Sequence, residues 1–187
     1  DFEFDHGAQF FTARSGAFRT FLQSLIERGV VADWQGPFAE LSGNGPAKLR
    51  TWGEDYPHYV GTPRMNSIGK FLSEGLNIEL KTEITAITRA RKGWLLSAGA
   101  GKEFGPFDWL VMASPAPQTA TLACAYPDLV KFCGERPMLG CFALMLGFES
   151  PVDLPMQAAI IEDADISWIS VNSSKPDRGS PFTIVVH

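Results

Sequence analysis

The chain has 187 residues, of which 45% are hydrophobic and 20% are charged, and its formal net charge at pH 7 is −5. This composition is typical of a globular protein with room for one large domain or two small ones. The acidic balance argues against a nucleic-acid partner, because phosphate binding needs a basic stripe and none is visible. No apolar run approaches the roughly 20 residues that span a bilayer, so we expect no membrane partner.

Cysteine and histidine usage argues against disulfides and metals. The three cysteines, at positions 124, 133 and 141, form no CxxC pair and leave an odd count. We therefore expect reduced, buried thiols and a cytoplasmic protein. The three histidines, at positions 6, 58 and 187, show no ligand spacing, so we predict no metal site.

Both ends of the chain resemble interrupted strands. The chain begins at Asp1 inside an aromatic run without a methionine, and it ends on the β-branched run 182–187. We therefore expect this sequence to be a fragment of a longer protein.

The first third of the chain predicts an extended segment, a helix and short strands. Residues 1–13 predict an extended stretch broken by a turn at Gly7. Ser15 can cap the helix that follows, and Gly29 can end it. Residues 30–60 predict short strands and turns, with a loop at 42–46. The expected buried face of the helix repeats every three or four residues and consists of Phe18, Phe21, Leu22, Leu25 and Ile26.

The middle of the chain predicts a second helix and a run of strands. Pro63 suits the first turn of a helix that begins at Thr62 and ends at Gly75, with Met65, Ile68 and Leu72 on its inner face. Strands are expected at 78–80, 83–88, 94–97 and 109–113. The glycine-rich turn 99–102 joins strand to strand, so it predicts a hairpin and not a phosphate loop.

These elements predict a specific pairing. Residues 82–88 and 94–97 should form an antiparallel hairpin, while the apolar run 109–113 should lie parallel to 77–80, covered on both faces. An alternative is a single antiparallel sheet over residues 77–113. One or two short helices are expected within 115–132, followed by strands at 141–148, 158–161, 167–171 and 182–186. The fold class is α/β (α+β), with a β-meander and a further mixed or antiparallel sheet.

Local motifs give no catalytic residue. The chain has no GxSxG motif, and we assign no residue as a general base. In open α/β sheets, ligands bind outside the carboxyl ends of the strands. The end of 109–113 is therefore a candidate contact edge, and we expect the small residues Ala113 and Ser114 to share one cofactor rim with Gly7 and Ala8.

Several segments together resemble the bacterial renalase-like flavoproteins of the flavin-containing amine oxidase superfamily. The similarity lies in residues 5–12 (DHGAQFFT), 59–61 followed by 65–66, 82–87 and 107–118. It covers most of residues 2–120 and is weaker afterwards. The family's GxGxxG segment would lie before Asp1.

The resemblance implies cofactor-binding positions for FAD. The turn Asp5, His6, Gly7, Ala8 and Gln9 matches the stretch that runs near the flavin ring. Ile84 matches the position that meets adenine, and Ala113 with Ser114 matches the strand end beside the pyrophosphate and ribityl chain. Arg64 and Met65 begin the helix before the meander. For each position a purely structural role is the alternative.

The resemblance also implies domains and a reaction. Residues 1–14 and 61–134 would form a partial, Rossmann-like FAD-binding domain, and 15–60 and 135–187 a substrate-binding domain. The parent would be an oxidoreductase that transfers hydride from a small dihydronicotinamide-type or amine substrate to the flavin, with reoxidation by dioxygen. The isolated chain is expected to be inactive and to hold FAD weakly or not at all. The alternative is a non-enzymatic binding or interaction domain with a half-Rossmann layer. The sequence leaves the oligomeric state open.

Overall fold

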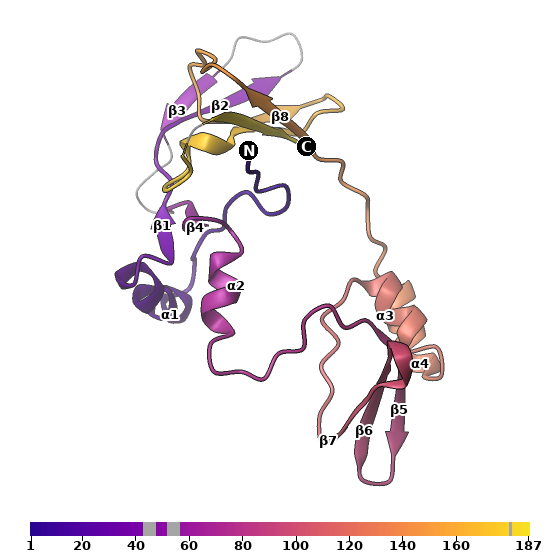
Figure 1. Ribbon diagram of the computed structural model, residues 1–187. Coiled ribbons are helices and arrows are strands. Elements are labelled where there is room, and N and C mark those ends of the chain that lie inside the picture. Colours follow the sequence, from indigo (N-terminus) through magenta and orange to yellow (C-terminus); the bar gives the residue numbers. More distant parts are fainter. Residues whose placement is uncertain (43–47, 52–56, 180) are drawn as a thin grey trace. The chain divides into compact units, whose positions relative to one another are not determined.

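The computed structural model describes residues 1–42, 48–51, 57–179 and 181–187 (Figure 1). The chain forms two compact units: a larger unit of Asp1–Leu76 and Cys141–His187, and a smaller unit of Asn77–Gly140. Both contain helices and strands, which confirms the α/β (α+β) class. Most of the loop expected at 42–46 lies outside the described residues. No described helix has the length and apolar character needed to cross a membrane.

The two units do not coincide with the expected domains. Residues 1–14 and 61–76 belong to the larger unit, together with the residues expected to form the substrate-binding part. The boundary between 134 and 135 falls close to the structural boundary after Gly140. The assignment of cofactor and substrate binding to these parts stays a prediction.

The larger unit begins with the predicted helix. Helix α1 (Gly16–Glu27) is capped by Ser15, whose hydroxyl accepts a hydrogen bond from the backbone N–H of Phe18. It ends before Gly29, which adopts a left-handed φ of 68° that suits glycine. The expected buried face is only partly correct: Leu22 and Leu25 are buried. Phe18 and Phe21 are exposed and stack on each other, because the polypeptide covers only one side of the helix.

Strands of the larger unit form two sheets. β1 (Val31–Asp33) pairs with β4 (Tyr59–Gly61). Among the described residues a second sheet has the order β3-β2-β9-β10-β11-β8, with only β2 and β9 parallel. Its late strands confirm the four strands predicted after residue 140. Its members are β2 (Pro37–Ser42), β3 (Lys48–Thr51), β8 (Leu144–Phe148), β9 (Ala158–Glu162), β10 (Trp168–Val171) and β11 (Phe182–Val186).

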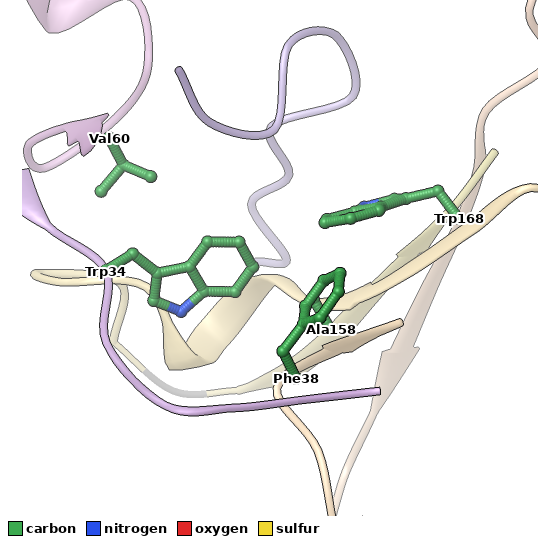
Figure 2. Close-up of a cluster of buried hydrophobic side chains, with 5 residues drawn as sticks. All are labelled: Trp34, Phe38, Val60, Ala158 and Trp168. Carbon is green, nitrogen blue, oxygen red and sulfur yellow. The ribbon is translucent and has the colours of Figure 1, made fainter. Parts of the chain in front are cut away.

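An aromatic cluster forms the core beside this sheet. Trp34, Phe38, Val60, Ala158 and Trp168 are buried together, and Phe10 packs against them. Figure 2 shows the Trp34 and Trp168 indoles extending toward each other, with the Phe38 ring beside them. Large aromatic side chains bury much apolar area each, so this cluster is a major source of stability for the unit.

The second predicted helix is shorter than expected. Helix α2 covers only Ser67–Leu72 and has no buried residue. Residues 62–66 form turns instead, because Thr62 donates its backbone N–H to Val30 O (2.9 Å) and its hydroxyl to Gly29 O. Leu72, expected on an inner face, is exposed.

The smaller unit contains a three-stranded antiparallel sheet and two helices. β5 (Ile84–Ala90), β6 (Gly93–Ala98) and β7 (Glu103–Phe107) pair in chain order, which confirms the hairpin predicted for 82–97. The turn at 99–101 joins β6 to β7, so it is a hairpin turn as expected. Helices α3 (Ala116–Leu122) and α4 (Pro127–Gly134) contact each other, and α3 contacts β5.

Two predicted strands are wrong. Residues 77–80 and 109–113 are not strands and do not pair with each other. The strand that pairs with β6 after the hairpin turn is β7, which ends at Phe107, before the apolar run 109–113 begins. Trp109 is 88% exposed and Val111 is 85% exposed, so this run is not covered on both faces. The expectation of buried thiols also fails for Cys124 and Cys141, which are exposed, whereas Cys133 is buried and all three are free.

The packing of α1 gives a first prediction. Replacing Leu25 with alanine should lower the unfolding free energy by about 2–4 kcal/mol, because its fully buried side chain would leave a cavity. Replacing Phe21, on the exposed side of the same helix, should cost less than about 1 kcal/mol. Urea unfolding of both variants measures the difference. Equal losses would show that Phe21 is buried, as the sequence pattern suggested.

Candidate functional site

The turn of residues 5–9 is held by a buried polar network, which we call the Asp5 network: Asp5, Gln9, Ser170, Asn172, Lys175, Arg178 and Thr183. These residues come from the N-terminal segment, from β10 and β11, and from the loop between those two strands. The N-terminal segment has no regular structure before Phe11, which pairs with Tyr59 through a single bridge. Side-chain contacts therefore determine where this segment lies.

Asp5 is the centre of the network. One carboxylate oxygen, Oδ2, accepts hydrogen bonds from Arg178 Nη2 at 2.6 Å and Arg178 Nε at 3.0 Å. The other, Oδ1, accepts from the backbone N–H of Met65 at 3.1 Å. The backbone N–H of Asp5 donates to Asn172 Oδ1 at 3.2 Å. One aspartate thus connects three segments that are far apart in the sequence.

Lys175 lies in the interior of the same network. Its side chain is fully buried, with Nζ 2.9 Å from Gln9 Oε1, 3.4 Å from Asn172 Oδ1 and 3.5 Å from Asp5 Oδ2. The Nζ atom also lies 5.3 Å from the centre of the Trp34 ring. Gln9 is held from both ends, because its Oε1 accepts from Ser170 Oγ at 2.9 Å and its Nε2 donates to the carbonyl oxygens of Asp5 and Gly7.

Burial and the neighbouring charges together set the pKa values of Asp5 and Lys175. Burial of Asp5 alone would raise its pKa. The hydrogen bonds from Arg178 and Met65 and the nearby positive charges outweigh burial, so the pKa of Asp5 lies below its usual 3.8. Burial lowers the pKa of Lys175 from 10.5 to about 8; Asp5 opposes this change, and the positive charge of Arg178 adds to it.

The other predicted residues of the turn face outward. His6, Gly7 and Ala8 are exposed, and a Cβ atom added to Gly7 would meet nothing within 4 Å. Arg64 is also exposed and forms an ion pair with Glu3. Met65 joins the network through its backbone, while its sulfur accepts from the N–H of Gly61 at 3.2 Å. The structure therefore brings the predicted positions 5–9, 64 and 65 together, with an open surface at Gly7.

The smaller unit contains the other predicted positions in one cavity of about 750 Å³. We call it the Ile84 cavity. Ile84, Ala113 and Ser114 all line it, although Ile84 lies in β5 and the other two precede α3. Its remaining lining is mostly apolar: Glu83, Thr85, Ile87, Leu96, Leu110, Val111, Met112, Gln118, Thr121 and Leu122.

Ser114 is fixed at the start of α3. Its hydroxyl lies 2.8 Å from the hydroxyl of Thr119, and Thr119 Oγ1 donates to the Ser114 carbonyl oxygen at 3.0 Å. A second cavity of about 660 Å³ shares Ile87, Leu110, Met112 and Ser114 with the first. Cavities of this size and apolar character suit organic ligands with a few fixed polar contacts.

The shared rim stays a prediction. Gly7 belongs to the larger unit and Ala113 to the smaller one. Sequence reasoning missed Asn172, Lys175 and Arg178. A signal was present, since two cations lie three residues apart in a Ser- and Pro-containing loop between two strands. Nothing in the sequence indicated that this loop faces Asp5, 170 residues away.

The chain was compared with protein families and with solved structures. No family model matches the chain. Among solved structures, the chain is similar to an Exiguobacterium sp. 255-15 protein that carries the provisional name protoporphyrinogen oxidase, with 17% sequence identity and a TM-score of 0.47. The match covers 69% of this chain and 30% of that one.

The Asp5 network gives a second prediction. Replacing Asp5 with asparagine should lower the unfolding free energy by about 3–5 kcal/mol at pH 7, because two buried cations lose their carboxylate. Asp177 provides a matched control: it is exposed in the same loop and has a left-handed φ of 57°, which asparagine also accepts. Asp177→Asn should change stability by less than about 0.5 kcal/mol.

The pH dependence of this loss follows from the lowered pKa of Asp5. The stabilising contribution is present above the usual carboxyl pKa of 3.8 and is lost as the pH falls through the lower pKa of the folded state. The stability difference between the wild-type chain and Asp5→Asn should therefore shrink as the pH falls below about 4. Urea unfolding from pH 7 to pH 3 measures it. A difference that grows on acidification would contradict this account.

Proposed function

We propose that this chain is part of an FAD-dependent oxidoreductase and that it binds the cofactor with two sets of residues. The Ile84 cavity would take the adenosine half of FAD. The exposed turn at Gly7 would lie along the flavin. The observation that carries this proposal is the convergence of Ile84, Ala113 and Ser114 on one cavity, since the sequence resemblance implied contacts with the same cofactor for all three.

The residues of the cavity fit an adenine and its ribose. Apolar side chains such as Leu96 and Leu110 suit the faces of an aromatic base, while Ser114 and Gln118 offer polar groups to hydroxyls. The irregular backbone at 109–113 has no backbone hydrogen-bond partner among the described residues, so its N–H and C=O groups could bind base edges or phosphate. When bound, FAD would supply the hydride acceptor.

The proposed substrate is a small reduced molecule of the dihydronicotinamide type. This proposal rests on the turn Gly7-Ala8-Gln9, which resembles the renalase-like pattern more closely than the amine-oxidase one. The role of this chain would be to orient substrate and cofactor and to exclude water. Dioxygen would reoxidise the cofactor.

Filling the cavity gives a third prediction. In the parent protein, Ala113→Phe should weaken FAD binding by about tenfold or more, because the added ring occupies the ligand's space. Ala86→Phe is the matched control, since Ala86 is exposed on β5 and does not line the cavity. Fluorescence titration with FAD measures both affinities. Equal affinities for the two variants would rule out the cavity as the adenosine site.

A fourth prediction concerns the substrate. Under anaerobic conditions, the flavin of the parent protein should be bleached rapidly by a dihydronicotinamide and slowly or not at all by benzylamine. Stopped-flow absorbance measures both rates. Rapid reduction by benzylamine alone would favour the amine-oxidase type instead.

A second candidate function is a binding or interaction domain without catalysis. The exposure of Trp109 and Val111, on a segment that pairs with no strand among the described residues, favours it, because unpaired backbone can accept a strand from a partner. The absorbance spectrum of the purified parent protein distinguishes the two. A yellow preparation with flavin bands supports the oxidoreductase, and a colourless one supports the interaction domain.

A further inference from the structure

Lys175 is a buried charge that the proposed function does not use. The exposed residues of the turn, His6, Gly7 and Ala8, are the ones expected to meet a ligand, yet Lys175 has no exposed surface of its own. Its ammonium group contacts both ends of that turn instead, at Asp5 Oδ2 and at Gln9 Oε1. Burying a lysine ammonium group costs free energy, and its contacts must offset that cost.

The contacts of Lys175 converge on Gln9. The Gln9 side chain accepts from Lys175 and Ser170 at Oε1, and it donates to the Asp5 and Gly7 carbonyl oxygens through Nε2. Gln9 therefore links the ammonium group by hydrogen bonds to the backbone on both sides of His6. If Lys175 is removed, Gln9 retains only the neutral Ser170 donor at Oε1 among the described contacts.

The local charge balance depends on Lys175. Two charged groups face it in the described structure, the carboxylate of Asp5 and the guanidinium of Arg178. The exposed ion pair between Glu3 and Arg64 lies beside Asp5 and is neutral overall. With Lys175 protonated, the network carries two cations on one carboxylate. Burial lowers the pKa of Lys175 to about 8, so its protonated form still predominates at neutral pH and is lost as the pH rises above that value.

We propose that Lys175 is a positioning residue whose protonated side chain holds the turn of residues 5–9, through Gln9 and Asp5, in the geometry that cofactor contact requires. The positioning of the turn by Lys175 involves residues of this chain only. The effect of that positioning on cofactor contact rests on the proposed function. Above neutral pH, loss of the lysine proton changes the hydrogen bonding of Gln9 and relaxes the turn.

The test is a pH titration of the Gln9 side-chain amide by NMR in the ¹⁵N-labelled 187-residue chain. The resonance is assigned by its disappearance in Gln9→Leu. It should shift between pH 6 and pH 10 with a midpoint near the lysine pKa of about 8. A flat titration in the wild-type chain would overturn the proposal without any variant at position 175.

Variants separate the charge of Lys175 from its bulk. Lys175→Met should abolish the titration and speed exchange of the Asp5 and Met65 amide protons by about tenfold or more, since both amides donate within the network. Lys175→Arg keeps a charge throughout this pH range, so it should abolish the titration and retain the protection. Lys70→Met, at an exposed lysine in α2, is the control and should leave both signals unchanged. A titration that persists in Lys175→Met would refute the proposal.

A separate measurement tests the link to the cofactor. In the flavin-loaded parent, the absorbance spectrum should titrate with the same midpoint as Gln9, and Lys175→Met should remove that titration. If Gln9 titrates and the flavin spectrum does not, Lys175 holds the turn but the turn does not contact the cofactor. That outcome would contradict the cofactor part of the proposal and leave the hold on the turn established.

Discussion

The larger unit depends on the buried interaction of Asp5 with Arg178 and Lys175. Before Phe11, the N-terminal segment has neither a helix nor a strand, so sheet hydrogen bonds cannot determine its position. Asp5 replaces them by accepting hydrogen bonds from a loop side chain and from the backbone of Met65. A buried carboxylate with charged partners has few alternative positions, because any displacement leaves unpaired charges in the interior. The turn at Gly7 is exposed, yet it is anchored on both sides.

The smaller unit is stabilised in a different way. Its sheet is a local meander, and Tyr126 connects it to the helices by an edge-to-face contact with Trp94 and by accepting a hydrogen bond from the N–H of Arg89 at 3.0 Å. The Ile84 cavity is lined in part by residues 110–113, which form no strand among the described residues. An antiparallel meander beside unpaired backbone is suited to a ligand that has both an apolar ring and polar edges. The larger unit thus contains a charged polar network, whereas the smaller unit contains a mostly apolar cavity.

Sequence patterns predicted the local elements well and the long-range contacts poorly. Ser15 and Gly29 marked both ends of α1, because capping depends on nearby residues only. The run 109–113 has the composition of a covered strand, but pairing needs a neighbour that composition does not supply. Phe21 has the period of the buried face and is still exposed, since it stacks on the likewise exposed Phe18 at the rim of the helix and not in the core. Asp5 and Gln9 were identified through resemblance, whereas Lys175 and Arg178 were missed because only the fold brings their loop to the N-terminal segment.

A double-mutant cycle between Asp5 and Arg178 tests the central claim most directly. The cycle compares the unfolding free energies of the wild-type chain, Asp5→Asn, Arg178→Met and the double variant. If the buried pair anchors the N-terminal segment, the two substitutions should be strongly non-additive, with a coupling energy of about 2–3 kcal/mol at pH 7. A coupling energy below about 0.5 kcal/mol would mean that the two residues contribute independently, and that another interaction holds the turn of residues 5–9 in place.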